Sequence, residues 1–263
     1  MGKFPSIKTL SIGAGMSNNK EISKRQARKQ QVRRKEQRSR LLGIGLVTAG
    51  ALFIAFLFIY PNVRPIGEIV SAPEVERGIV DFNTAGDPNA PIKIEEYSDY
   101  QCPYCRIFFE NTEDALTQSY IANGTVHFVY RSFGSFIGAE SGRAAEASYC
   151  AGDQDKFWDM HDIIFANQTG ENAGSYTDRR LTAFAEEIGL DMDEFGSCFN
   201  GGKYADRVEE DFKDGVEAGI RATPSFVMTY TVNGETKTRV IEGAQPFDVF
   251  QQEIEAALAE IGQ

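Results

Sequence analysis

An uncharged apolar stretch near the N-terminus restricts the fold of this 263-residue chain more than any other feature. Leu41–Tyr60 holds 20 residues without a charged side chain, and its polar members are Thr48 and Tyr60. As an α-helix that rises about 1.5 Å per residue, it spans about 30 Å, the thickness of the hydrocarbon core of a bilayer. The sequence therefore predicts one transmembrane helix over residues 41–60.

The charges on the two sides of this stretch predict its orientation. Residues 1–40 carry 12 Lys and Arg and two Glu, a net charge of +10, whereas the rest carries 15 Lys and Arg against 36 Asp and Glu, a net charge of −21. Because Lys and Arg collect on the cytoplasmic side, we expect a single-pass cell-membrane protein with a cytoplasmic N-terminus and an extracytoplasmic remainder. The acidic remainder argues against nucleic acid as a partner.

A cleaved signal peptide is the competing interpretation, with Val70-Ser71-Ala72 as a weak cleavage candidate. The long basic region and the length of the apolar run favour an uncleaved signal-anchor instead. We expect residues 1–40 to be a disordered or loosely helical cytoplasmic arm, since they hold few large apolar groups. Residues 61–77 contain three prolines and are predicted to be a linker that lifts the domain of residues 78–263 off the membrane.

The first half of that domain predicts a strand, helix and strand unit. Gly78–Phe82 reads as a short strand, Ile92–Tyr97 as a buried strand, and Thr125–Phe133 as a β-branched and aromatic strand. Between the last two, Cys102–Ile121 is predicted to be a helix, so that the strands lie parallel with a right-handed crossover. The inward positions expected on this helix are Ile107, Phe108, Ala115, Leu116 and Ile121.

The second half begins with an all-helical block and ends with a hairpin and a helix. Apolar residues at helical spacing predict four or five helices at about residues 138–217. A strand is expected directly after Pro224, a turn at Asn233-Gly234, and a partner strand at Thr236–Ile241. Residues 247–261 are predicted to form a final amphipathic helix.

The motif Cys102-Pro103-Tyr104-Cys105 lies between a predicted strand and a predicted helix. A thiol near the unpaired N–H groups of a helix start is favoured as a thiolate, and a second thiol three residues on can resolve a mixed disulfide. This pattern indicates a redox centre. A plain structural disulfide and half of a zinc site are the alternatives for the motif taken alone.

The order of these elements resembles the thioredoxin fold, and the helical block resembles the insertion of the DsbA-like thiol–disulfide oxidoreductases. The resemblance covers about residues 78–263 and is carried by Glu96–Cys105, by Phe157-Trp158 with His161, and by Gly219–Phe226. It implies an α/β protein: a thioredoxin fold with an inserted all-helical domain, preceded here by one N-terminal transmembrane helix.

The resemblance also implies roles for residues around the motif. Pro224 corresponds to a cis proline beside the active-site cysteines, which leaves the main chain of Thr223 free to pair with a substrate strand; a trans proline is the alternative. Glu96 corresponds to an acid buried under the disulfide, where a raised pKa lets it move a proton for Cys105. The alternative is that Glu96 points outward and that Glu95, or neither, is buried.

One position departs from the family's commonest motif. DsbA-type enzymes typically have His where this chain has Tyr104, and Tyr104 supplies no positive charge to the Cys102 thiolate. We therefore expect a weaker oxidant than DsbA itself. The same four residues occur in glutaredoxins, which are shorter and lack both the helical insertion and a membrane anchor.

The remaining cysteines and histidines are expected to have structural roles. If Cys102 pairs with Cys105, a structural disulfide between Cys150 and Cys198 is the remaining intramolecular pair, and some DsbA-like relatives carry a second disulfide in this region. Two buried free thiols are the main alternative, and a four-cysteine zinc site has unsuitable spacing. His127 and His161 are expected to be packing or surface residues.

Taken together, the sequence predicts a protein thiol–disulfide oxidoreductase that introduces disulfides into exported proteins. Cys102 is expected to be the exposed nucleophile and Cys105 the resolving thiol. By resemblance, a DsbB- or VKOR-like membrane protein reoxidises the pair, and neither a bound cofactor nor a metal is implied. The rivals are a disulfide reductase or isomerase that uses the same site, and a non-enzymatic thioredoxin-like binding module.

Overall fold

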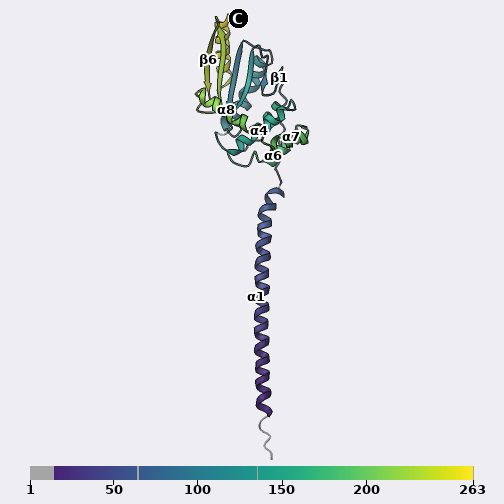
Figure 1. Ribbon diagram of the computed structural model, residues 1–263. Helices are drawn as coiled ribbons and strands as arrows, with labels where there is room; N and C mark the ends of the chain where they lie inside the picture. Colours follow the sequence, from purple (N-terminus) through teal and green to yellow (C-terminus); the bar gives the residue numbers. More distant parts are fainter. Residues whose placement is uncertain (1–14, 64, 135, 263) are drawn as a thin grey trace, which may run out of the picture. The chain divides into compact units, whose positions relative to one another are not determined.

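The computed structural model describes residues 15–63, 65–134 and 136–262 (Figure 1). It divides into two units, Met1–Pro65 and Ile66–Gln263, and each is described by itself. The first unit holds α1 (Gly15–Val63). Within α1, Lys24–Tyr60 has a mean hydropathy of 2.5 over its most apolar window, and it is long and apolar enough to cross a membrane. Signal sequences near an N-terminus meet the same criterion.

The described part of the basic arm takes the helical form, one of the two that were expected. Residues 15–40 are helical and continuous with the apolar stretch, and the helix runs past Pro61 to Val63. Residues 1–14 lie outside the described residues. Lys, Arg and Gln are good helix formers, and extending an existing helix avoids the cost of nucleation, which explains the continuity.

A six-stranded sheet forms the centre of the second unit, in the order β1-β2-β4-β3-β5-β6. β3 and β4 are parallel, as predicted, and the other pairs are antiparallel. The strands are β1 (Val80–Asp81), β2 (Thr84–Ala85), β3 (Ile92–Ser98), β4 (Val126–Ser132), β5 (Ser225–Val232) and β6 (Glu235–Glu242).

The expected first strand was wrong in its extent. Only Val80 and Asp81 of residues 78–82 are in β1, and the chain turns at once into β2, which the sequence did not predict. Phe82 has a φ of 51°, and this left-handed conformation ends β1. Its ring stacks on Tyr149 at 5.7 Å between centroids, a long-range contact that offsets the local strain.

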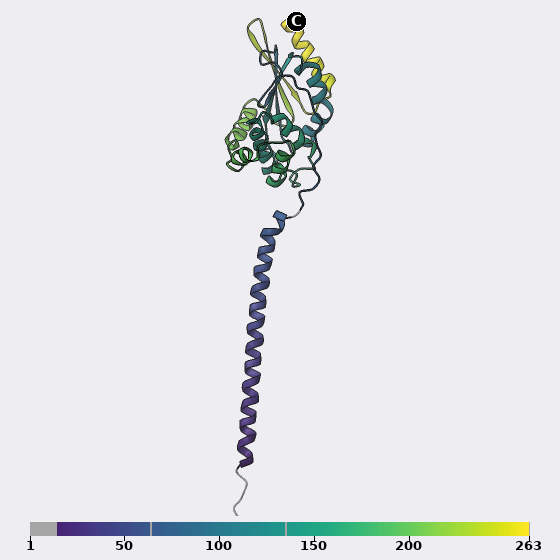
Figure 2. The ribbon, with the colours of Figure 1, turned by 90° about the vertical axis from the view of Figure 1, so that its right-hand side faces the viewer.

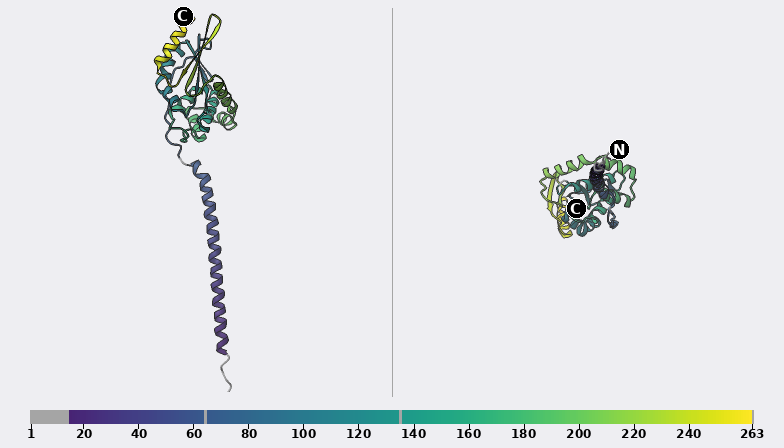
Figure 3. Two further views of the ribbon diagram at one scale, coloured as in Figure 1. Left: turned by 90° about the vertical axis from the view of Figure 1, so that its left-hand side faces the viewer. Right: turned by 90° about the horizontal axis from the view of Figure 1, so that it is seen from below.

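Helices cover both faces of the sheet. On one face lies the helix that follows Cys102, made of α2 (Pro103–Phe108), a π-turn (Phe109–Glu113), α3 (Asp114–Leu116) and a second π-turn (Thr117–Ile121). Figures 2 and 3 show α9 (Phe247–Ile261), in yellow, beside this teal helix. On the other face, α8 (Ala205–Glu217) packs against β4, and Phe212 contacts Phe133 at 4.5 Å between ring centroids.

Among the described residues, the inserted block contains five helices, and the sequence predicted four or five. They are α4 (Ala139–Gly152), α5 (Phe157–Ala166), α6 (Asp178–Glu187), α7 (Met192–Asn200) and α8. The Phe157 ring packs against Tyr130 of β4 at 5.6 Å, and Trp158 packs against Phe128 at 6.2 Å. These aromatic side chains join the block to the sheet in one core.

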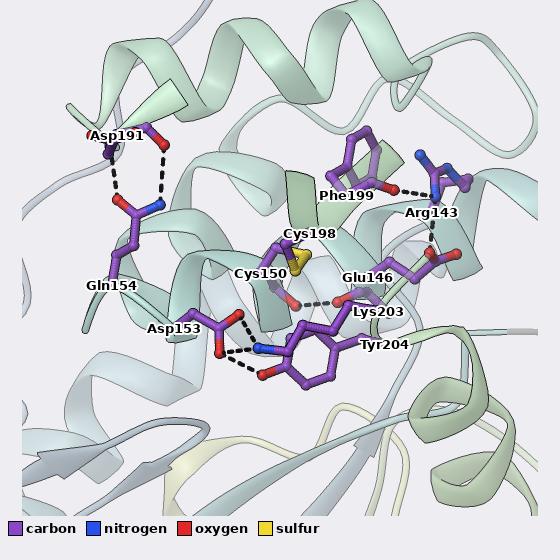
Figure 4. The surroundings of a disulfide bond; sticks show 12 residues. Arg143, Glu146, Cys150, Asp153, Gln154, Asp191, Cys198, Phe199, Lys203 and Tyr204 are labelled. Carbon is purple, nitrogen blue, oxygen red and sulfur yellow. Dashed lines mark hydrogen bonds and ion pairs between the residues drawn. A yellow bond between two sulfur atoms is a disulfide. The ribbon is translucent and has the colours of Figure 1, made fainter. Parts of the chain in front are cut away.

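Cys150 of α4 and Cys198 of α7 form a disulfide (Figure 4). Hydrogen bonds support the same junction: Lys203 and Tyr204 both bond Asp153, and Gln154 exchanges two bonds with the main chain of Asp191. The pairing agrees with the sequence-based expectation for these two cysteines.

Residues 66–77 are more than a spacer, because they pack onto the helical block. The main chain of Val70 exchanges two hydrogen bonds with the Asn167 side chain, at 2.9 and 2.7 Å. Arg180 bonds the carbonyl of Ile66, and Arg77 is 6% exposed. The compact unit thus begins at Ile66, before the boundary expected at residue 78.

The α4–α7 disulfide leads to a stability prediction. In the entropic model, closing the 49-residue loop from Cys150 to Cys198 destabilises the unfolded chain by about 4 kcal/mol. In a Cys102→Ala/Cys105→Ala background, replacing both cysteines by Ala should lower the free energy of unfolding in urea by about 2–4 kcal/mol. Strong reductant should bring the background protein to the same value. Stability that responds to neither change would contradict a structural role.

Candidate redox site

The motif cysteines occupy the first turn of α2. Cys102 is the N-cap residue, with φ −68° and ψ 122°, and Pro103 stands in the first turn. Pro is favoured there because the first N–H groups of a helix have no intrahelical partner. These unpaired N–H groups form the positive end of the helix, so the sulfur of Cys102 lies where a negative charge is stabilised.

Both motif sulfurs are in the reduced form and are buried. Cys105 is 0% exposed and Cys102 is 5% exposed, so the expectation of an exposed Cys102 was wrong. The reason is that the segment before β5 covers it: Cys102 Sγ lies 3.3 Å from the carbonyl oxygen of Thr223. Cys102 is still the more accessible sulfur, and Tyr104 beside it is 62% exposed.

The Thr223–Pro224 peptide bond is cis, as predicted. Pro224 directly precedes β5, and its carbonyl accepts a hydrogen bond from Gly243 at 2.8 Å. When Cys102 carries its proton, the thiol donates to the Thr223 carbonyl, so the main chain of Thr223 is not free, contrary to the expectation. A substrate strand that paired with the Thr223 carbonyl would replace that contact.

The two thiols have opposite acidities. A hydrogen bond from the Cys105 thiol, with help from the N–H groups of Cys105 and Tyr104, lowers the pKa of Cys102 to about 6 against the opposing effect of burial. Burial raises the pKa of Cys105 well above its usual value, and the neighbouring Cys102 thiolate and Glu96 raise it further. At neutral pH the pair therefore holds one thiolate and one thiol.

Strand alternation explains which glutamate lies behind the cysteines. Glu96 shares a face of β3 with the core residues Ile92 and Ile94 and is 1% exposed, whereas Glu95 faces α8 and bonds Arg131. Burial, followed by the negative charge of Glu113, raises the pKa of Glu96 well above its usual value. Glu96 is thus the buried acid, as expected.

The turn between β3 and α2 is held by the inserted helical block. Gln168 Nε2 donates to the carbonyls of Tyr100 and Cys102, at 2.7 and 3.1 Å. The Tyr176 hydroxyl donates to the same Tyr100 carbonyl at 3.0 Å. The sequence analysis did not identify these residues, because neither belongs to a motif with recognisable spacing.

Asp99 links this turn to α4 and to the resolving sulfur. Its carboxylate accepts bonds from Ser141 Oγ at 2.5 Å, from the Gln101 N–H at 2.8 Å and from the Ile137 N–H at 3.1 Å. Its own N–H points at Cys105 Sγ, 3.5 Å away. The bonds of the Asp99 carboxylate therefore hold in place the main-chain N–H that contacts Cys105 Sγ.

Below the cysteines lies a buried charged cluster that the sequence did not predict. Arg77 donates two bonds to Asp162, at 2.9 and 2.7 Å, and one to Glu113 at 2.9 Å. His161 Nδ1 lies 2.8 Å from Asp162 Oδ1. Glu113, His161 and Asp162 bring possible metal-ligand atoms within 4.8 Å of one another. The Arg77 guanidinium bonds both carboxylates and offsets one of their two negative charges, and we assign no metal to this cluster.

The histidines behave as packing residues. His161 is 0% exposed, and its ring lies against those of Tyr130 and Phe165, at 5.2 and 5.0 Å between centroids. His127 is half-buried on β4. Neither ring belongs to a nucleophile–base pair among the described residues.

Comparisons with known proteins agree with this geometry. A family model described as Thioredoxin matches residues 81–255. Disulfide bond formation protein D of Bacillus subtilis is 26% identical over 176 residues, which cover 66% of this chain and 75% of that protein. The solved structure of oxidised BdbD from Bacillus subtilis matches with a TM-score of 0.59 and 24% identity, over 72% of this chain and 100% of that one.

A larger relative is a protein of Salinispora arenicola named Na(+)/H(+) antiporter NhaA 1. It is 29% identical over 197 residues, which cover 70% of this chain but only 29% of that protein's length. The similarity therefore concerns one segment of that relative. Because the family model covers more than half of the residues, the chain belongs to the Thioredoxin family, and the cis Thr223–Pro224 bond beside Cys102 agrees with that assignment.

Proposed function

We propose that this chain is a thiol–disulfide oxidoreductase that introduces disulfides into exported proteins through Cys102 and Cys105. The observation that carries the proposal is the contrast between the two sulfurs at one helix start. Cys102 lies beside the cis Thr223–Pro224 bond with its pKa lowered to about 6, while Cys105 is fully buried with a raised pKa. A low-pKa thiol is both a reactive nucleophile and a good leaving group.

The reaction follows from this asymmetry. A substrate thiolate attacks Cys102 Sγ of the Cys102–Cys105 disulfide, that bond breaks, and Cys105 leaves with the electron pair and takes a proton from Glu96. A second substrate thiolate then attacks the substrate sulfur of the mixed disulfide and expels Cys102 as a thiolate. The substrate loses two electrons and forms a disulfide, and the enzyme dithiol gains them.

The surroundings of Cys102 suit a protein substrate. Tyr104 and Ile107 are exposed by 62% and 43% and lie one helical turn apart. Ile107 was expected to point inward, and that expectation was wrong, because the buried face of the helix passes through Cys105 and Phe108. These two apolar side chains give an unfolded segment a surface beside the reactive sulfur.

The location and partner belong to the same proposal. We place the catalytic domain outside the cytoplasm and anchor it by Leu41–Tyr60, supported by the apolar helix and the basic residues before it. A reduced Cys102–Cys105 dithiol must pass its electrons on before the next cycle. A membrane redox protein of the DsbB or VKOR type would accept them.

Tyr104 supports a second candidate function, which is the same chemistry run as a reductase or isomerase. A cationic side chain at this position would stabilise the Cys102 thiolate and thereby the reduced form, and Tyr104 supplies no such charge. The reduction potential separates the two directions. A value near or below about −270 mV, that of thioredoxin, would support the reductase.

The acidity of Cys102 can be measured directly. In the reduced full-length chain in detergent, thiolate absorbance at 240 nm should rise with a midpoint near pH 6. Cys105 should stay protonated through neutral pH, because burial raises its pKa. A Cys102→Ala variant should lose the step. A midpoint near the ordinary thiol value of about 8.5 would show that the helix start does not activate Cys102.

Trapping the intermediate tests the function itself. In Cys105→Ala, the Cys102 thiolate attacks a disulfide of an exported protein, one sulfur of that disulfide leaves as a thiolate, and no resolving thiol remains to reverse the step, so mixed disulfides should accumulate in cells. Cys102→Ala, the matched control, should trap none. In vitro, the oxidised wild-type chain should form the disulfide of a reduced dithiol peptide in a 1:1 reaction. No exchange by wild type would reject an enzymatic role and favour a binding module.

A further inference from the structure

A second buried carboxyl, that of Glu113, is near enough to Glu96 for its charge to act on it. Glu113 is on the first π-turn of the helix that follows Cys102 and is 3% exposed. Its Oε1 accepts a bond from Arg77, whereas its Oε2, like Oε2 of Glu96, is buried without a hydrogen-bond partner among the described residues. Unsatisfied buried carboxyl oxygens are rare, and two neighbouring ones favour a state in which only one carboxyl is ionised.

The charge of Arg77 settles which carboxyl is ionised. Arg77 is a cation that donates to Glu113, while within the described part of the chain the groups that act most strongly on Glu96 carry no positive charge. Asp162 takes the other two bonds of Arg77 and so shares its charge. Glu113 is thus the anion, held on one oxygen by Arg77, and Glu96 is the carboxyl that keeps the proton.

While Cys102 and Cys105 form a disulfide, the other described groups near Glu96 carry no charge. Around Glu96 are Cys102 and Cys105 from α2 and the phenols of Tyr100 and Tyr130, whose pKa values are raised by burial. The residue opposite Glu96 on β5 is the apolar Phe226.

The surroundings of Glu113 are equally defined. On α5, His161 Nε2 lies 4.0 Å from Glu113 Oε2, and His161 Nδ1 bonds Asp162. His161 Nε2 has no hydrogen-bond partner among the described residues. Arg77 therefore remains the group that compensates the charge of Glu113.

We propose that Glu113, anchored by Arg77, is a positioning residue that keeps Glu96 protonated until Cys105 needs the proton. The inference rests on the proposed redox role of Cys102 and Cys105. When a substrate thiolate attacks Cys102, the Cys102–Cys105 bond breaks, Cys105 departs with the electron pair, and the proton of Glu96 moves to it. The fixed charge of Glu113 prevents Glu96 from losing that proton to solvent beforehand.

The test is the pH dependence of disulfide reduction in the full-length chain in detergent. The oxidised protein is mixed with a reduced dithiol peptide, and the loss of the Cys102–Cys105 disulfide is timed from pH 5 to pH 9. Glu113→Gln keeps an oxygen for Arg77 but removes the charge, so Glu96 should ionise at lower pH. The rate should be unchanged at pH 5 and about tenfold lower at neutral pH.

Asp114→Asn is the matched control, because Asp114 is adjacent, exposed and bonded to Gln118. It should follow the wild-type profile. In a Glu96→Gln background, adding Glu113→Gln should change the profile no further, since Glu113 acts through Glu96. An equal loss at every pH, or the same effect with and without Glu96, would overturn the proposal.

Two further measurements keep the test decisive. If Glu113→Gln does not fold, Glu113→Asp withdraws the charge by one methylene and should move the midpoint part of the way; an unchanged midpoint would count against the proposal. If wild type exchanges no disulfides, the proposed function fails by itself. An infrared titration of the Glu96 carboxyl, with Glu96→Gln as reference, still tests Glu113 and should show a midpoint that falls in Glu113→Gln.

Discussion

The hydrogen bonds that Gln168 donates to the Tyr100 and Cys102 carbonyls hold the turn that carries Cys102, and the rest of the site depends on the position of this turn. The turn between β3 and α2 is buried, so its main-chain groups need protein partners. The helix supplies one of them, because the Arg106 N–H of α2 donates to the Cys102 carbonyl at 3.2 Å. The connection between α5 and α6 supplies others, because Gln168 and Tyr176 both donate to the Tyr100 carbonyl. The helical block therefore holds the start of α2, and with it Cys102, in place.

The two sulfurs then differ in their burial and in their distance from the helix start. Cys102 meets the free N–H groups of the first turn, which stabilise its thiolate. Cys105 lies one turn further into the core, where burial disfavours any charge. Only Cys105 therefore needs a proton when the disulfide opens. This explains why the buried acid Glu96 lies on the core face of β3, behind Cys105.

The sequence predicted those parts of the fold that have a periodic pattern or a characteristic turn dipeptide. Alternation in β3, the Asn233-Gly234 turn and the helical spacing of the inserted block all matched the structure. The two-residue strands β1 and β2 are too short to show a period. The same holds for the site. The sequence predicted Cys102, Cys105 and Pro224 because they belong to motifs. It did not predict Gln168 or Arg77, because they bond residues far away in the sequence and leave no local pattern.

Arg77 also shows why composition misplaced the start of the domain. Residues 61–77 look like a linker because they contain three prolines. Yet Arg77 is buried and bonds residues 36 and 85 positions away in the sequence. Removing one partner of a buried ion pair costs about 3–5 kcal/mol, because the charges left behind are neither paired nor hydrated. Without Arg77, Glu113 and Asp162 would be left in that state. The buried ion pairs of Arg77 thus tie the segment before β1 to the compact unit, which begins at Ile66 and holds the cysteines.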